Sequence, residues 1–168
     1  MSQLSHADFM NSDLGRFVDE RLNANQADVV HDLLAHLAEQ MIEMNKQKQA
    51  EAKGFLAWLE RHVGATIDDL TSKTKLREFH EYDLPTLLGV LNQNQAKLKK
   101  PVTRAVEEEI EREFKHSMDR LAPLKEEIAA TNRLIDLIVY RLYGLTEEEV
   151  AIVEGTATDQ PTRGESSP

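Results

Sequence analysis

The sequence has no cysteine, only seven glycines and five prolines, and a single tryptophan in 168 residues. Without cysteine, disulfide bonds, thiol catalysis and cysteine-ligated zinc or iron–sulfur centres are excluded. Long apolar runs are also missing, and no apolar segment opens the chain. We therefore expect neither a membrane span nor a secretory signal, and predict a cytoplasmic protein that has no membrane contact.

The residues that are abundant favour helices. Alanine, leucine, glutamate, lysine, glutamine and arginine dominate the sequence, and these residue types have high helix propensity. No stretch alternates between apolar and polar residues over the length of a strand. The composition and the patterning together predict an all-α protein.

Two segments carry apolar residues at alternating spacings of four and three, which is the heptad pattern of helices that pack along their length. The first segment lies between residues 26 and 53. Its two heptads favour ordinary core packing over pairing with a separate helix, although both readings stay open. The seam residues of this segment are Val30, Leu34, Leu37, Met41 and Met44.

The second segment, residues 106–142, is longer and favours a coiled-coil-like hairpin or bundle helix. Within it, Pro123 predicts a kink or break near Leu121 and Ala122, because proline cannot donate the helical hydrogen bond. Similarly, we expect Gly54 to end the first helix. The apolar seam residues of the second segment are Ile110, Phe114, Leu121, Leu124, Ile128, Ile135, Ile138 and Leu142.

These patterns divide the chain into three parts. Residues 1–25 are expected to form an irregular arm or a short helix around residues 14–22. Residues 26–155 are expected to form a single all-α module, a helical bundle with long heptad-patterned helices and short capping helices. Its last helix begins with a capping box of Thr146 and Glu149. Residues 156–168 have the polar composition of a disordered tail.

The net charge of −10, from 20 basic and 30 acidic residues, is unevenly distributed. Residues 73–104 contain seven basic and three acidic residues, a net charge of +4, so this basic segment interrupts an otherwise acidic chain. Its cations are candidate contacts to a DNA backbone, although lysines at a helix C-terminus also complement the helix dipole. The seven candidates are Lys73, Lys75, Arg77, Lys97, Lys99, Lys100 and Arg104.

Catalytic and metal sites find little support. The sequence has no nucleophile elbow, no phosphate-binding glycine loop and no His-Glu-x-x-His motif. Glu113 and His116 have the spacing of the carboxylate–histidine pairs in di-iron helical bundles, and Asp28 and His31 have the same spacing. Because charged residues surround Glu113 and His116, a solvated helix flank is the better reading, and we predict neither a catalytic residue nor a metal ligand.

Several stretches resemble a known family. They are DVVHDLLA from residue 28, AEQMIEMNK from residue 38, GFLAWLER from residue 54 and IDDLTSKTK from residue 67. The most specific is TNRLIDLIVYRLYGLTEEEVAIVE, residues 131–154. Together they resemble the C-terminal helical region of adenine-N6-specific DNA methyltransferases, including fused restriction–methylation enzymes of restriction–modification systems.

The resemblance implies a role in recognising DNA but no activity of this chain alone. Members of that family bind S-adenosylmethionine in a Rossmann-like domain and hold the target adenine with an Asn-Pro-Pro-Tyr motif. This sequence contains neither motif, nor a nuclease centre. We therefore expect a non-catalytic accessory or target-recognition module that binds no cofactor. S-adenosylmethionine is expected on a catalytic methyltransferase or restriction–methylation partner that acts on the same DNA.

The alternative is a helical dimerisation or scaffold protein that has no role on DNA. In that case the two heptad seams would mediate self-association into a homo-oligomer, and the basic segment would be incidental.

Overall fold

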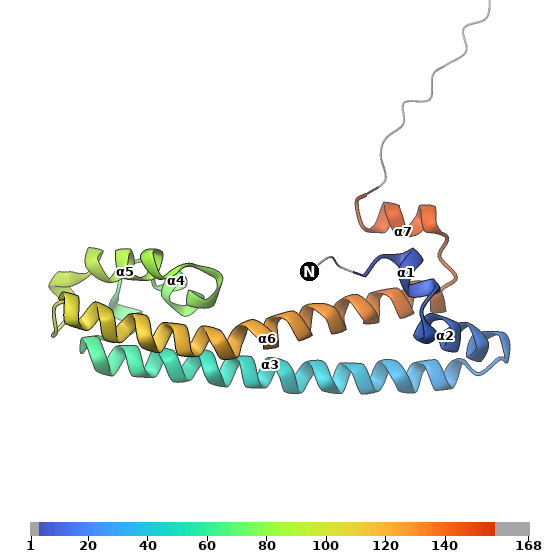
Figure 1. Ribbon diagram of the computed structural model, residues 1–168, viewed down its shortest axis with the longest axis horizontal. Helices are drawn as coiled ribbons and strands as arrows, with labels where there is room; N and C mark the ends of the chain where they lie inside the picture. Colours follow the sequence, from blue (N-terminus) through green and yellow to red (C-terminus); the bar gives the residue numbers. More distant parts are fainter. Residues whose placement is uncertain (1–3, 157–168) are drawn as a thin grey trace, which may run out of the picture. The chain divides into compact units, whose positions relative to one another are not determined.

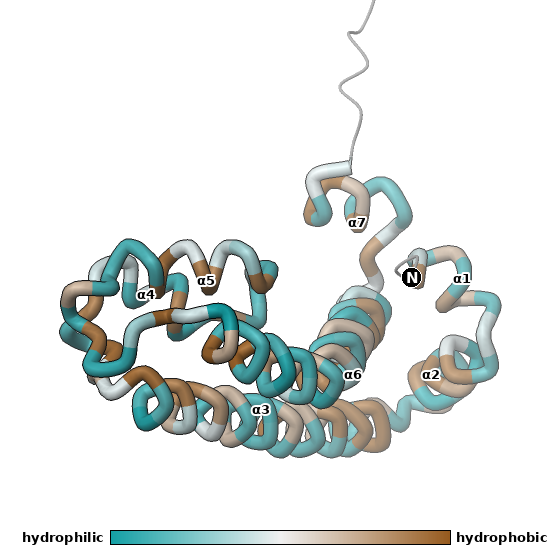
Figure 2. The backbone as a smooth tube through the Cα atoms, turned by 60° about the vertical axis from the view of Figure 1, so that its left-hand side comes forward, coloured by the Kyte–Doolittle hydropathy of each residue, from teal (hydrophilic) through white to brown (hydrophobic). Residues whose placement is uncertain are grey.

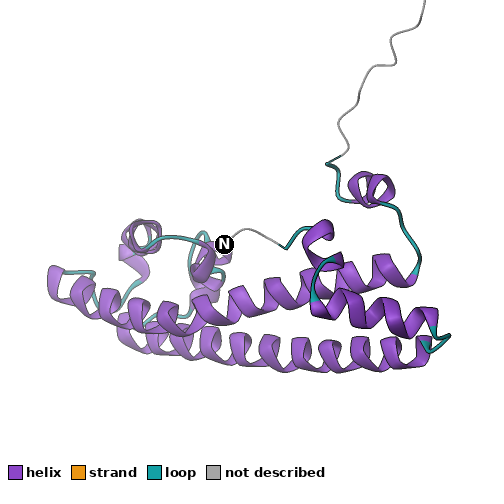
Figure 3. Cartoon of the chain, turned by 45° about the vertical axis from the view of Figure 1, so that its right-hand side comes forward, coloured by secondary structure: helices purple, strands orange, loops and turns teal. Residues whose placement is uncertain are grey.

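The structure is a computed structural model that describes residues 4–156, and these residues form seven α-helices and three short 3₁₀ turns (Figure 1). The described residues contain no strand, so the all-α prediction is confirmed for them (Figure 3). The predicted tail lies outside the described residues from residue 157 onward. In chain order, the elements are α1 (His6–Met10), α2 (Asp13–Asn23), α3 (Ala27–Val63), η1 (Ile67–Asp69), α4 (Lys73–Arg77), η2 (Phe79–Glu81), α5 (Leu84–Gln93), η3 (Gln95–Lys97), α6 (Arg104–Leu142) and α7 (Glu147–Val153).

The chain divides into two compact units, each with its own hydrophobic core. The terminal unit combines residues 1–38 with residues 130–168, and the central unit comprises residues 39–129. The two long helices, α3 and α6, each contribute residues to both units. The candidate DNA-contacting residues all belong to the central unit.

Of the two readings of the N-terminus, α2 at residues 13–23 matches the short helix expected around residues 14–22, whereas α1 replaces the irregular arm at residues 6–10. Ser5 and Ser12 cap the two helices by accepting hydrogen bonds from the backbone N–H groups three residues later. Phe9 and Val18 are fully buried in the core of the terminal unit. The apolar residues around them show little helical periodicity in the sequence. Both side chains nevertheless pack in one core with residues of α3 and α6.

The helix α6 ends at a glycine stop. Gly144 adopts the left-handed conformation, with φ of 68°, and the Leu145 N–H donates to the Tyr140 carbonyl over 2.9 Å. This is the hydrogen bond of a Schellman motif, which ends helices at glycine. The predicted capping box of α7 is also present, since Thr146 and Glu149 bond to each other's backbone N–H groups.

The helix break predicted at Gly54 is wrong, because α3 continues from Ala27 to Val63. Gly54 is exposed, and a Cβ atom added there would meet nothing within 4 Å. A glycine inside a helix costs about 1 kcal/mol relative to alanine, which a 37-residue helix packed against others tolerates.

A break at Pro123 is also absent, since α6 is helical on both sides of this residue. Pro123 is exposed, as is Asp119, whose carbonyl loses its helical hydrogen-bond partner to the proline. Water can therefore satisfy that carbonyl, and packing of the helix elsewhere offsets the remaining cost.

The two heptad seams face the interior of the chain. None of the thirteen apolar seam residues is exposed. In the terminal unit, Val30 and Leu37 share a core with Leu137 and Ile138. In the central unit, the α6 seam packs into a core that also includes the C-terminal half of α3. The colouring in Figure 2 shows how hydrophobic and hydrophilic residues alternate along both long helices.

Replacing Pro123 should therefore stabilise the protein. Pro123→Ala restores the missing backbone donor without removing a buried side chain, so we expect the free energy of unfolding to rise by about 1 to 3 kcal/mol. Urea unfolding followed by circular dichroism measures this change. Pro85→Ala is the matched control, because Pro85 lies in the first turn of α5, where proline is tolerated. A destabilised Pro123→Ala variant would contradict this account of α6.

Candidate nucleic-acid interface

Three phenylalanine rings fix the framework that carries the basic segment. Phe79 of η2 is fully buried, with its ring centroid 4.2 Å from that of Phe55 on α3 and 5.9 Å from that of Phe114 on α6. Leu76 of α4 and Leu91 of α5 are fully buried in the same core. The short helices α4 and α5 are thereby packed onto the α3 and α6 segments of the central unit (Figure 1).

A buried asparagine links the two cationic stretches of the basic segment, residues 73–77 and 97–104. Asn94, at the end of α5, is 2% exposed. Its Oδ1 accepts hydrogen bonds from the Thr71 backbone N–H at 2.8 Å and the Thr71 hydroxyl at 2.9 Å. Its Nδ2 donates to the carbonyls of Thr71 and Val90. The turn that precedes α4 is thus fixed to the turn that precedes η3.

The next residue holds the loop between η3 and α6. The Gln95 Oε1 accepts a hydrogen bond from the Val102 backbone N–H at 3.1 Å, which anchors the far end of this loop. At its near end the loop crosses the C-terminus of α3, where the Lys100 N–H donates to the Val63 carbonyl over 3.1 Å. Lys99 and Lys100 are consequently held beside the last turn of α3.

Gly64 makes this crossing possible. Its φ of 67° lies in the left-handed region that favours glycine. A Cβ atom there would also lie only 2.8 Å from the Cβ of Lys99. Gly64 therefore ends α3 and also leaves room for the lysine loop.

All seven predicted cations are exposed, but many have partners. Asp68 of η1 forms an ion pair with Arg77 and lies 4.0 Å from Lys73, while Arg104 pairs with Glu108. The neighbouring Asp69 accepts a hydrogen bond from Lys97 Nζ at 2.7 Å through its backbone carbonyl. The structure thus brings the cations of α4 and η3 to adjacent residues of η1. Sequence reasoning predicted a short turn at residues 67–70 but missed its pairing with these cations, because its two aspartates lie outside the basic segment.

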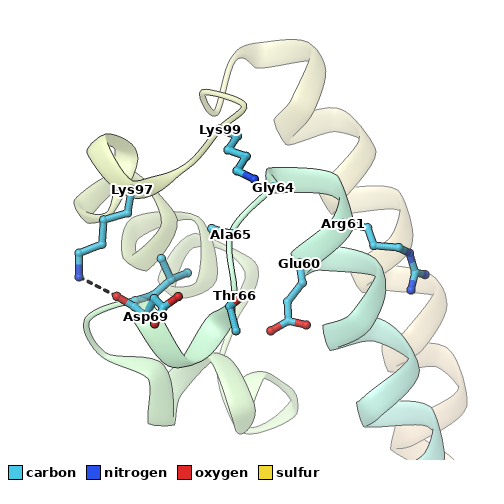
Figure 4. A pocket seen from close by; sticks show the side chains of 9 residues that line it. Glu60, Arg61, Gly64, Ala65, Thr66, Asp69, Lys97 and Lys99 are labelled. Carbon is cyan, nitrogen blue, oxygen red and sulfur yellow. Dashed lines mark hydrogen bonds between the residues drawn. The ribbon is translucent and has the colours of Figure 1, made fainter.

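A shallow cavity of about 430 Å³ lies beside this meeting point (Figure 4). Lys97 and Lys99 line it together with Glu60 and Asp69, and Arg61 also contributes. In Figure 4 the Arg61 side chain points away from the two lysines. Glu60 accepts a hydrogen bond from the Ile67 backbone N–H at 2.8 Å, so its carboxylate has a structural role.

Three neighbouring lysines of η3 and the loop after it have no acidic side-chain partner, although Lys97 also donates to the Asp69 carbonyl. Lys97, Lys99 and Lys100 take part in none of the ion pairs found among residues 4–156. Lys75 is also outside these pairs, and its Nζ lies 5.9 Å from the Tyr82 ring centroid. We refer to Lys97, Lys99 and Lys100 as the lysine cluster.

A second polar contact secures η2. Lys125 Nζ lies 2.8 Å from Glu81 Oε2 and donates to the His80 carbonyl over 3.0 Å. The hydrogen bond from Lys125 is the main cause that lowers the pKa of Glu81 below 4.5, and His80 acts in the same direction. Partial burial opposes this shift.

The described residues contain no group of three or more histidine or acidic side chains that could hold a metal ion. Glu113 and His116 instead line a groove between α3 and α6, while Asp28 and His31 are exposed on α3. No helix within residues 4–156 is both long and apolar enough to cross a membrane.

The fold and this surface define an all-α protein that presents a local lysine cluster on an acidic chain. A family model described as a domain of unknown function, DUF8810, matches residues 25–139, and the chain belongs to this family. The match includes all of α3 and the complete basic segment. No curated protein and no solved structure matches the chain.

Removing the Asn94 side chain should loosen the framework of the lysine cluster. Asn94→Ala deletes four hydrogen bonds and leaves part of the Thr71 backbone unpaired, so we expect a loss of about 2 to 4 kcal/mol of stability. Denaturant unfolding measures this loss. Asn92→Ala, at an exposed position on the same helix, should change stability by less than about 0.5 kcal/mol. Equal effects of the two substitutions would contradict the role given to Asn94.

The Glu81 contact should contribute stability only when the carboxylate is charged. Because its pKa is lowered on folding, the contribution is present above about pH 4.5 and is lost as the pH falls through the lower folded value. We expect Glu81→Gln to reduce the melting temperature at pH 7 and to have little effect at pH 3. Thermal melts at both values test this expectation, and an equal reduction at both would contradict it.

Proposed function

We propose that this protein is a non-catalytic helical module of a DNA adenine-N6 methyltransferase or restriction–modification system, and that it helps to position DNA for a catalytic partner. The lysine cluster is the observation that carries the proposal. Three cations without acidic partners lie on one loop and its adjoining turn, and such residues can contact phosphates directly.

The surrounding charge favours one oriented contact. The whole chain has a net charge of −10, so most of its surface repels DNA. Attraction is limited to the basic segment, and Asp68 neutralises part of that segment through Arg77 and Lys73. A single small cationic surface gives weak binding by itself, which suits a module that depends on a partner for affinity.

The expected contact is to the phosphate backbone. The only tryptophan, Trp58, already stacks on His62 with ring centroids 4.6 Å apart, and also lies against Phe55. Its indole is therefore engaged within the chain. Phosphate contacts orient a protein on DNA, while reading of the base sequence requires other groups, which we assign to the catalytic partner.

The resemblance of residues 28–154 to methyltransferase C-terminal regions supports the choice of partner. S-adenosylmethionine and the Asn-Pro-Pro-Tyr motif would belong to that partner, and the cytoplasm would be the compartment of both. Candidate partners are products of neighbouring open reading frames that carry this motif.

A mobility-shift assay with a short DNA duplex tests the proposal. We expect weak binding by the full chain at 50 mM salt and loss of binding when Lys97, Lys99 and Lys100 are all changed to Glu. If each lysine neutralises one phosphate, neutralising the three with Gln should reduce the slope of log affinity against log salt by about 2 to 3. Adding the catalytic partner should strengthen binding by the unaltered chain.

The matched control reverses three other exposed lysines of the central unit, Lys46, Lys53 and Lys115. This variant has the same net charge as the first and should retain DNA binding. Equal losses of DNA binding in both variants would show that only the net charge of the chain matters, which would contradict the proposal. Absence of both DNA binding and a methyltransferase partner would also contradict it.

The scaffold alternative has a specific difficulty. It assigned self-association to the heptad seams, but nine of the thirteen seam residues lie in the hydrophobic cores of the two units. Self-association through the whole length of either seam would therefore have to open a core.

A further inference from the structure

An elongated groove in the central unit lies between α3 and α6 and has a volume of about 650 Å³. Phe55 and Trp58 of α3 and Leu124 of α6 supply its apolar lining. Ala50 and Gly54 line the α3 side, where their small size leaves the helix backbone accessible. The groove contains none of the lysine cluster, although Arg61 at its end also lines the cavity beside that cluster.

Four of the seven α3 residues that line the groove belong to a second heptad stripe, distinct from the inward seam. Its members follow one another at spacings of four, three, four, three and four. All are exposed except Ala57, which is partly buried. The stripe has small residues at its centre and a basic residue at one end. At the other end is an acidic residue, Glu43, which also lies 3.8 Å from Lys46 and accepts a hydrogen bond from Gln47 in its own chain; all three side chains are exposed. Its members are Glu43, Gln47, Ala50, Gly54, Ala57 and Arg61.

We propose that this face of α3 binds the same face of a second copy of the chain, with the two α3 helices antiparallel and in close contact. In the register that centres the pair between Ala50 and Gly54, Ala50 lies opposite Gly54 of the second copy. Gln47 lies opposite the second copy's Ala57, and Glu43 lies opposite its Arg61. The small residues let the helix backbones approach, and the apolar wall of the groove borders the contact.

Charge complementarity selects this occupant and this direction. Antiparallel pairing places an acidic residue against a basic one at each end, whereas parallel pairing would place Glu43 against Glu43 and Arg61 against Arg61. The same stripe therefore complements itself in one orientation only. Such an arrangement is isologous and closes after two copies.

The paired stripe extends over 19 residues of helix, from Glu43 to Arg61, and its ends are about 27 Å apart. A contact one helix wide over that length is smaller than the roughly 800 Å² per partner of a stable complex. The dimer is therefore expected to be weak and to depend on protein concentration.

Sedimentation equilibrium of the full chain over a wide range of concentration tests the proposal. The average mass should rise from 19.1 kDa towards twice that value as concentration increases. Gly54→Gln should abolish the increase, because the new side chain separates the helices. The substitution leaves the fold intact, since the space beside Gly54 is empty and glutamine favours helix. Circular dichroism verifies the fold.

Gly89→Gln is the matched control. Gly89 lies in α5, away from the groove, and its would-be Cβ atom also meets nothing within 4 Å. This variant should dimerise like the unaltered chain. The variant in which Lys97, Lys99 and Lys100 become Glu should also dimerise, which separates this proposal from the proposed DNA contact.

A charge exchange tests the antiparallel register. Arg61→Glu and Glu43→Arg should each weaken dimerisation, and the double variant should restore it. A chain that stays monomeric at every concentration would overturn the proposal. So would a dimer that Gly54→Gln leaves unchanged, or failure of the double variant to recover, since either result would place the contact elsewhere or in another direction.

Discussion

The packing of Phe79 between α3 and α6 is the constraint on which the described central unit depends. Its ring contacts Phe55 and Phe114, and so joins the two long helices to the short elements that follow α3. The turns from η1 to η3 contain few residues each and could not form a core of their own. With η2 anchored, Asn94 holds the turn before α4 and Gln95 holds the loop before α6. These two side chains therefore position the two ends of the basic segment.

This dependence explains how an acidic chain can present a local positive surface. The lysine cluster is carried by an η turn and a loop, and the loop is attached to the end of α3 through Val63 and Gly64. Backbone hydrogen bonds hold the loop, so the lysine side chains need not form ion pairs to be positioned. Their charges consequently stay available to an external anion. Lys73, Arg77 and Arg104 instead pair with acidic residues of η1 and the start of α6.

Regular features of the fold could be predicted from the sequence, since heptad spacing locates the buried faces of α3 and α6 and glycine marks the ends at Gly64 and Gly144. The breaks expected at Gly54 and, as one of two possibilities, at Pro123 are absent because packing over nearly forty residues outweighs local propensity. The helix α1 was missed because Phe9 finds its neighbours far along the chain. The candidate cations were identifiable from charge alone, but their pairing with Asp68 was not.

Hydrogen–deuterium exchange of the full chain, with and without a DNA duplex at low salt, tests the central claim most directly. Contact through the lysine cluster predicts slower exchange in residues 97–104 and in the adjoining turn after Val63, with α1, α2 and α7 unchanged. Exchange that is unaltered in residues 97–104, or slowed only in the terminal unit, would contradict the assignment of DNA contact to this surface.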